Sequence, residues 1–145
     1  MPKSLATLLL LAISMQALAD PLLLDDLKSQ NGVRLTVDEL RVLMPGAKVV
    51  SRVETTGSTR YWMNELDGKF VASSDNRSGM GGMSGNTTAQ GTWSVADNGT
   101  YCVTLEWRKL TENWCRYIFR LGDKYYGVSS LASGTTKAHE FEFSK

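Results

Sequence analysis

The chain has 145 residues, of which 42% are hydrophobic and 21% are charged. This composition is typical of one globular domain and excludes a disordered, collagen-like or multi-span membrane chain. Sixteen basic and 15 acidic residues give a formal net charge of +1, so the basic excess of most nucleic-acid-binding proteins is missing and we expect no nucleic-acid partner.

The first nineteen residues have the layout of a secretory signal peptide. Lys3 precedes an apolar stretch, Leu5 to Met15, which is too short to cross a bilayer as a stable helix. Ala17-Leu-Ala19 then supplies the small residues that a signal peptidase requires. We expect cleavage after Ala19, a single mature domain of residues 20–145 without a membrane span, and a periplasmic or secreted location. An N-terminal anchor or a core helix is the alternative.

Two short helices are predicted at the start of the mature chain. Leu22–Gln30 precedes Asn31-Gly32, a pair that often ends helices in a left-handed conformation. Thr36-Val-Asp-Glu39 then matches a capping box, and the apolar side that follows ends at Pro45-Gly46.

From Ala47 onward, apolar and polar residues alternate between regularly spaced turns, which is typical of β-strands. Asp67-Gly68 and Asn98-Gly99 are strong signals for type I′ hairpin turns. Short strands joined by short turns imply an antiparallel meander. We predict a mainly β (α+β) fold, a curved sheet or incomplete barrel, with the N-terminal helices closing one end. The strands are expected near Lys48–Glu54, Arg60–Leu66, Lys69–Ser73, Gly91–Ala96, Tyr101–Trp107, Trp114–Leu121, Lys124–Ser129 and Lys137–Phe143.

Cys102 and Cys115 are the only cysteines, and an even number in an oxidising compartment favours a disulfide. If their strands pair antiparallel with the two cysteines opposite each other, Val103 faces Trp114. One side of this ribbon is then apolar apart from Arg116, as expected of a core face. A metal site or a redox pair is the alternative, but the Cys-x-x-Cys spacing and a second histidine are missing.

The glycine-rich residues from Ser74 to Gln90 are expected to form a long loop, which in a compact domain is either functional or disordered. Met80 and Met83 are its only large apolar residues, and thioethers suit Cu(I). Two methionines without a third fixed ligand make a weak metal site. We therefore expect no metal or other cofactor and keep both methionines as candidate binding residues.

Several motifs resemble a family of small exported bacterial proteins, catalogued as domain of unknown function number 995. They are Gly91-Thr-Trp93, Tyr101-Cys102-Val103, Trp114-Cys-Arg-Tyr117 and Gly122-Asp-Lys-Tyr-Tyr126. The likeness covers most of the mature chain. It implies an envelope location and a β-rich fold, and it implies no catalytic residue.

Enzyme chemistry would depend on few residues. His139 is the only histidine, it lies on the aromatic side of the last predicted strand, and no Gly-x-Ser-x-Gly motif accompanies it. We expect it at the margin of the core. Carboxylate pairs could hydrolyse glycosides, but each candidate pair equally fits a solvated strand face or hairpin tip. These pairs are Glu65 with Asp67, Glu106 with Glu112, and Glu140 with Glu142.

Adjacent aromatic residues are the strongest sign of binding. Tyr61-Trp62 and Tyr125-Tyr126 are neighbours in predicted strands, so one member of each pair must leave the core face. An outward aromatic residue can anchor a partner, or a helix or loop can cover it.

The sequence thus favours an exported, non-enzymatic binding or interaction protein of the bacterial envelope or exterior. It could act as an inhibitor, an adhesion factor or a virulence factor. The expected partner is a protein or a small apolar ligand, and the expected state is a monomer or weak dimer. The alternative is a small periplasmic hydrolase that uses His139 or a carboxylate pair.

Overall fold

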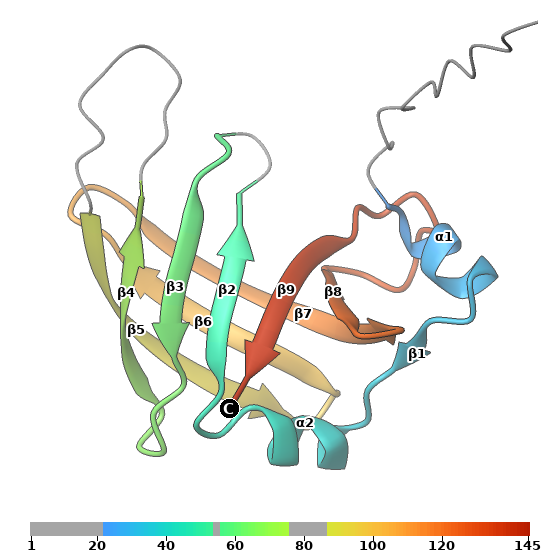
Figure 1. The fold of residues 1–145 in the computed structure, drawn as a ribbon, viewed down its shortest axis with the longest axis horizontal. Coiled ribbons are helices and arrows are strands. Elements are labelled where there is room, and N and C mark those ends of the chain that lie inside the picture. Colours follow the sequence, from blue (N-terminus) through green and yellow to red (C-terminus); the bar gives the residue numbers. More distant parts are fainter. Residues whose placement is uncertain (1–21, 54–55, 76–86) are drawn as a thin grey trace, which may run out of the picture.

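The computed structural model describes residues 22–53, 56–75 and 87–145 (Figure 1). The predicted signal peptide and the candidate residues Met80 and Met83 lie outside these ranges. Within them the chain forms two helices and nine strands: α1 Leu24–Ser29, β1 Val33–Arg34, α2 Val37–Leu43, β2 Lys48–Arg52, β3 Thr59–Met63, β4 Lys69–Ser74, β5 Thr87–Ala96, β6 Thr100–Glu106, β7 Thr111–Leu121, β8 Lys124–Val128 and β9 His139–Ser144.

The strands β2 to β9 form an antiparallel meander in which each strand pairs with the next. β9 also pairs with β2, with Val49 opposite Phe143, so the eight strands close into a barrel. The predicted mainly β meander is confirmed, and the barrel is more complete than the sequence indicated. Closure pairs the two edges that an open sheet would expose. The short β1 pairs with the second half of β7, with Val33 opposite Arg120.

The two ends of the barrel differ. β2, β4, β6 and β8 finish at one end of the barrel, and β3, β5, β7 and β9 begin there; this end is at the top in Figure 1, and we call it the open end. α2 lies across the other, closed end and buries Leu40 and Met44 in the interior. Its predicted capping box is confirmed. The Glu39 amide donates to Thr36 Oγ1 at 3.1 Å, and the Thr36 amide donates to Glu39 Oε1 at 3.2 Å.

The hairpin turns form where they were predicted, but the predicted type I′ geometry was wrong. Type I′ needs a positive φ at both central residues. Here only the glycines have one, with φ of 82° at Gly68 and 84° at Gly99. The amide of Gly68 donates to the Glu65 carbonyl and that of Gly99 to the Ala96 carbonyl, each at 3.0 Å. Each glycine therefore follows the turn, as in a three-residue hairpin connection.

The predicted loop from Ser74 to Gln90 is too long. β5 already begins at Thr87, and its Ala89 is buried opposite Ala72 of β4. Gly91 follows directly under the ring of Phe70, the residue opposite it, and any Cβ there would overlap that ring. The strand pairing of β4 with β5 thus extends further than the polar sequence suggested.

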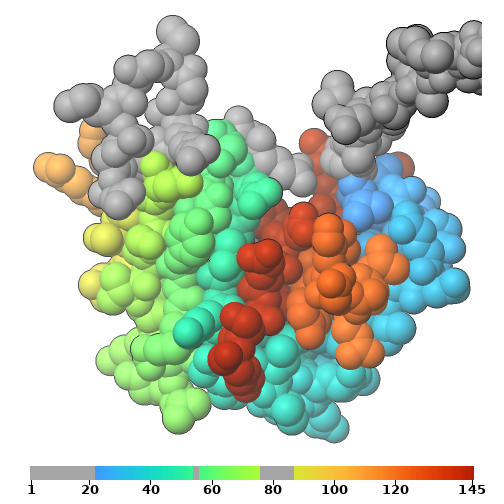
Figure 2. Space-filling model, in the orientation of Figure 1, coloured from blue at the N-terminus to red at the C-terminus, as the bar shows by residue number. Residues whose placement is uncertain are grey.

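Two hydrophobic clusters hold the fold together. The first fills the barrel interior and contains thirteen buried residues, including Trp62, Phe70 and Tyr101. The second lies between α1 and the outer face of β7 and β8, where Leu24 and Leu27 are fully buried. In Figure 2 the segment that contains α1 packs against β8.

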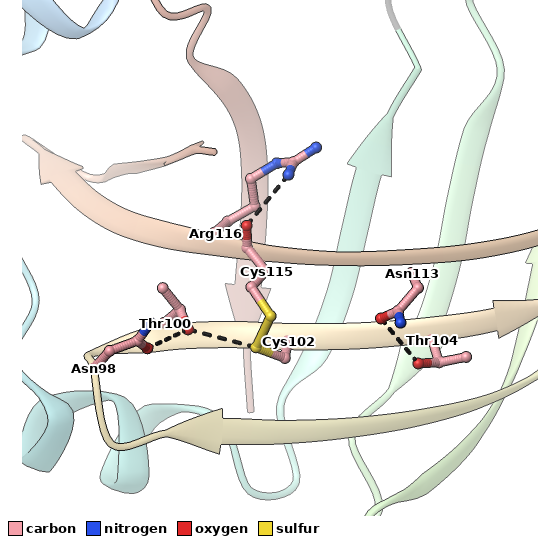
Figure 3. The surroundings of a disulfide bond; sticks show 7 residues. All are labelled: Asn98, Thr100, Cys102, Thr104, Asn113, Cys115 and Arg116. Atoms are coloured by element: carbon pink, nitrogen blue, oxygen red, sulfur yellow. Dashed lines mark hydrogen bonds between the residues drawn. A yellow bond between two sulfur atoms is a disulfide. The ribbon is translucent and has the colours of Figure 1, made fainter. Parts of the chain in front are cut away.

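The disulfide between Cys102 and Cys115 is confirmed. It joins directly opposed residues of β6 and β7, whose Cα atoms lie 4.0 Å apart (Figure 3). The predicted register is also confirmed, because Val103 lies opposite Trp114. The bond is on the outer face of the barrel, and the next residue, Arg116, is on the inner face.

Candidate functional site

The open end of the barrel contains a cavity of about 400 Å³, a volume suited to a small organic molecule. β2, β3, β7, β9 and the β8–β9 connection contribute its walls. The lining residues are Ser51, Val53, Arg60, Trp62, Glu112, Trp114, Arg116, Ser129, Lys137, Ala138, His139 and Phe141.

Strand alternation explains why charged and aromatic residues share this cavity. Side chains two positions apart on a strand point to the same face. Arg60 and Trp62 of β3 therefore both face inward, as do Glu112, Trp114 and Arg116 of β7. Both strands begin at the open end, so Arg60 lies closer to that end than Trp62, and Glu112 lies closer to it than Trp114.

Arg60 and Glu112 form a two-pronged ion pair across the cavity wall. Arg60 Nη1 and Nη2 donate to the two carboxylate oxygens at 2.5 and 2.8 Å, and the side chains are only 19% and 22% exposed. Such paired, charge-assisted hydrogen bonds fix both groups in place. The Arg60 guanidinium also lies 4.8 Å from the centre of the Trp107 ring. This pair adds no net charge to the cavity.

Two further cations line the same cavity, Arg116 and Lys137. In the part of the chain that the structure describes, neither forms an ion pair. The Arg116 guanidinium lies 5.3 Å from the centre of the Trp114 ring and donates to the Cys115 carbonyl at 3.2 Å. Burial lowers the pKa of Arg116, so charging this group carries a desolvation cost. The cavity therefore has an excess of positive charge.

His139 is the first residue of β9 and faces Ser51 of β2 across the cavity wall. Its Nε2 is 2.8 Å from Ser51 Oγ, and its ring packs edge-on against Phe141, with centres 4.7 Å apart. Burial, together with repulsion from Arg116 and Arg60, lowers the pKa of His139 to about 4, and Glu140 opposes this shift. The imidazole is therefore neutral at pH 7.

The lowered pKa of His139 predicts a pH-dependent stability. The unfolded chain takes up a proton near pH 6.5, whereas the folded chain does so only near pH 4, so the free energy of unfolding falls as the pH falls between these values. We expect a loss of about 2 kcal/mol after allowance for solvent screening. Urea unfolding at several pH values, with His139→Gln as reference, measures it. Identical pH profiles for both proteins would contradict the assignment.

An aromatic floor lies beneath the polar groups. Trp62 stacks on Phe70 with ring centres 5.3 Å apart, and Trp114 lies 6.5 Å from Trp62 and 5.8 Å from Phe141. Trp62 is 5% exposed and its position is fixed by hydrogen bonds within the core. The site thus combines charged groups with a rigid apolar base, and Arg116 lies against one of its rings, that of Trp114.

The four candidate aromatic residues lie in four different places. Trp62 lines the cavity, whereas Tyr61 is 49% exposed on the outer face of β3 beside Met63. Tyr125 packs near the closed end against Phe143, and Tyr126 is buried in the cluster under α1. The structure therefore brings only one of these four residues to the cavity. The partner role of Tyr61 stays a prediction.

The carboxylate pairs do not converge in the structure. Glu106 and Glu112 lie on opposite faces of the barrel wall, and Glu112 is paired with Arg60. Glu140 and Glu142 are exposed on β9, and Glu65 and Asp67 are exposed at the β3–β4 turn. No two of these carboxylates share the cavity.

Sequence reasoning missed most of the cavity residues, and the polar ones Ser51, Arg60, Arg116 and Lys137 are among them. One signal was present, because Arg116 is the charged exception on an otherwise apolar strand face. Arg60 gives the same signal two residues before Trp62. A charge at an inward strand position marks a polar cavity when the barrel is open at that end.

The described ranges give no support for a membrane-spanning helix or for a metal site. No helix there is long and apolar enough to cross a membrane. No group of three or more histidine, cysteine, aspartate or glutamate residues is placed to hold a metal ion among them.

Comparison with known proteins gives a family and no function. No curated protein and no solved structure matches the chain. The family described as "Protein of unknown function (DUF995)" matches residues 10–114, which include Arg60, Glu112 and Trp114 but end before Arg116 and His139. Because the match covers most of the 145 residues, the chain belongs to this family.

Proposed function

We propose that this protein is an exported, non-enzymatic binding protein that takes a small organic molecule in the cavity at the open end of its barrel. The observation that carries the proposal is the cavity itself, about 400 Å³ in volume, with preformed polar groups above an aromatic floor. Ligand sites are typically such concave, mostly apolar pockets with a few fixed polar groups. Export is supported by the signal-like N-terminus and by the disulfide.

The positions of the polar groups favour a small molecule over a protein partner at this site. Arg116 and His139 face the interior of a barrel, where the flat surface of a globular protein does not reach. α2 closes the other end, so a ligand would enter and leave through the open end. The neutral imidazole and the Ser51 hydroxyl would add hydrogen bonds to a polar part of the ligand.

A second candidate, a hydrolase, is favoured by one observation, the 2.8 Å contact between Ser51 Oγ and His139 Nε2. In such a reaction Oγ attacks an ester carbonyl, Nε2 takes the hydroxyl proton and returns it to the leaving alcohol, and water releases the acyl group. A fluorophosphonate reagent distinguishes the candidates. Under the binding proposal Ser51 stays unlabelled, and a Ser51 adduct that disappears in His139→Gln would establish the hydrolase instead.

Filling the cavity tests the binding proposal. Val53 lines the cavity, whereas Val50 lies on the outer face of the same segment. We expect members of a panel of small organic molecules to bind the wild-type protein in saturation-transfer NMR, and Val53→Trp to lose this binding because the indole occupies the cavity. Val50→Trp, the matched control, should bind as the wild type does. Absence of binding to the wild type, or equal binding to both variants, would contradict the proposal.

A further inference from the structure

We propose that the ligand is an organic anion, with a single carboxylate held by Arg116 and Lys137 and an apolar chain lying over Trp62, Trp114 and Phe141. This inference rests on the proposed function and names the chemical class of its ligand. It follows from the balance of charges in the cavity and from the order in which polar and apolar groups line it.

The charges of the cavity do not cancel. Among the residues that the structure describes, Glu112 is the only acidic one that lines it, and both carboxylate oxygens of Glu112 are taken by Arg60. Arg116 and Lys137 form no ion pair with any residue in the described ranges. Arg116 is partly removed from water, where an isolated charge is costly, and an anion that binds Arg116 and the exposed Lys137 would offset that cost.

The electrostatic potential is also positive at a second point of the cavity, the imidazole of His139. Arg116 and Arg60 both act to disfavour the protonated form of His139, even though Glu112 is paired with Arg60 and Glu140 acts in the opposite sense. A bound anion would counteract this repulsion. By linkage, it should raise the pKa of His139, and the anion should bind more tightly when that histidine is protonated.

The lining also limits the number and position of negative charges. The Glu112 carboxylate would repel a second anionic group, so the cavity fits one charge better than two. Beside Arg116, the cavity wall presents the aromatic rings of Trp62, Trp114 and Phe141, which favour an apolar chain or ring rather than a second polar group. A fatty acid of medium length, or an aromatic acid of similar size, has this distribution of charge and apolar surface.

Octanoate and its neutral amide, octanamide, test the inference, because they differ in the head group and share the chain. Tryptophan fluorescence or calorimetry at pH 7 should show that octanoate binds at least 10-fold more tightly than octanamide, as expected from a charge-assisted hydrogen bond. Arg116→Gln should remove this preference. Arg120→Gln removes the same charge further along β7, outside the cavity and near α2, and should leave the preference intact. Lys137→Gln should reduce the preference too. Because Lys137 is exposed, this second variant does not disturb the packing of the barrel.

The outcomes separate the inference from the proposed function. Equal affinity for octanoate and octanamide, abolished in Val53→Trp, would overturn the anionic class and leave a small-molecule site in the cavity. Loss of the preference in Arg120→Gln as well as in Arg116→Gln would place the anion elsewhere and overturn the assignment. Failure of octanoate, octanamide and every member of the panel to bind would overturn both claims.

Discussion

Replacing Asn64 by alanine should cost this protein about 3 kcal/mol or more of unfolding free energy. Asn64 is fully buried at the closed end, and its Oδ1 accepts from Tyr101 Oη at 2.7 Å and from Trp62 Nε1 at 3.2 Å. Its Nδ2 donates to the Met44 carbonyl at the end of α2, at 3.1 Å. The alanine variant leaves the buried Tyr101 hydroxyl without an acceptor, which is costly in the core, while the Trp62 indole keeps Tyr101 Oη and the Met44 carbonyl keeps the Ala47 amide as partners. Urea unfolding measures the loss.

Asn113→Ala is the matched control for this prediction. Asn113 is exposed on β7 and makes one long hydrogen bond, 3.3 Å, with Thr104. We expect its loss to change the unfolding free energy by less than about 0.5 kcal/mol, as for most surface substitutions. If both variants lost the same amount, the buried network around Asn64 would not be what attaches α2 to the barrel.

Removing the disulfide should be the next largest change. A Cys102→Ala/Cys115→Ala double variant frees a loop closed across 13 residues of separation, for which the chain-entropy model gives about 3 kcal/mol. Differential scanning calorimetry should show a fall in Tm of roughly 10 °C for a domain of this size. Because β6 and β7 remain paired through their backbone, we expect the variant to fold.

Thr104 and Asn113 provide the control for the disulfide. They form the next outward-facing opposed pair on the same two strands (Figure 3). A Thr104→Ala/Asn113→Ala variant removes a cross-strand contact worth at most about 1 kcal/mol. A fall in Tm equal to that of the cysteine variant would contradict a specific role for the covalent bond.

Local features of the fold could be predicted from the sequence because their determinants lie close together along the chain. The capping box of Thr36 and Glu39 satisfies helix groups three residues apart, and the turn dipeptides mark where successive strands reverse. The register of β6 and β7 could be predicted because the cysteines and the apolar alternation agree. All of these are contacts between neighbours in sequence.

Contacts between distant segments could not be predicted in this way. Closure of the barrel depends on β2 pairing with β9, whose sequences carry no signal for each other. The burial of Tyr126 depends on α1, about a hundred residues earlier, which packs on the outer face of β8. Alternation predicted that one of Tyr125 and Tyr126 leaves the inner face, but only the tertiary structure shows that it is Tyr126 and that a helix covers it.

The candidate cavity was hidden for the same reason. Ser51, Arg60 and His139 come from three strands separated by up to 88 residues, and they meet only because the barrel closes. Composition cannot reveal this arrangement, since the whole chain is nearly neutral. Arg116 was visible as a charge on an apolar face, yet a charge at such a position also fits a barrel rim.

The most direct test of the proposed binding function is an NMR titration with octanoate that follows the indole N–H signals of the four tryptophan residues. Trp62 and Trp114 line the cavity, whereas the Trp93 indole donates to the Glu65 carbonyl at 2.8 Å near the closed end. We predict saturable shifts of the Trp62 and Trp114 signals with the Trp93 signal unmoved. Shifts confined to Trp93, or no saturable shift with octanoate, octanamide or any member of the panel, would contradict a ligand site in the cavity.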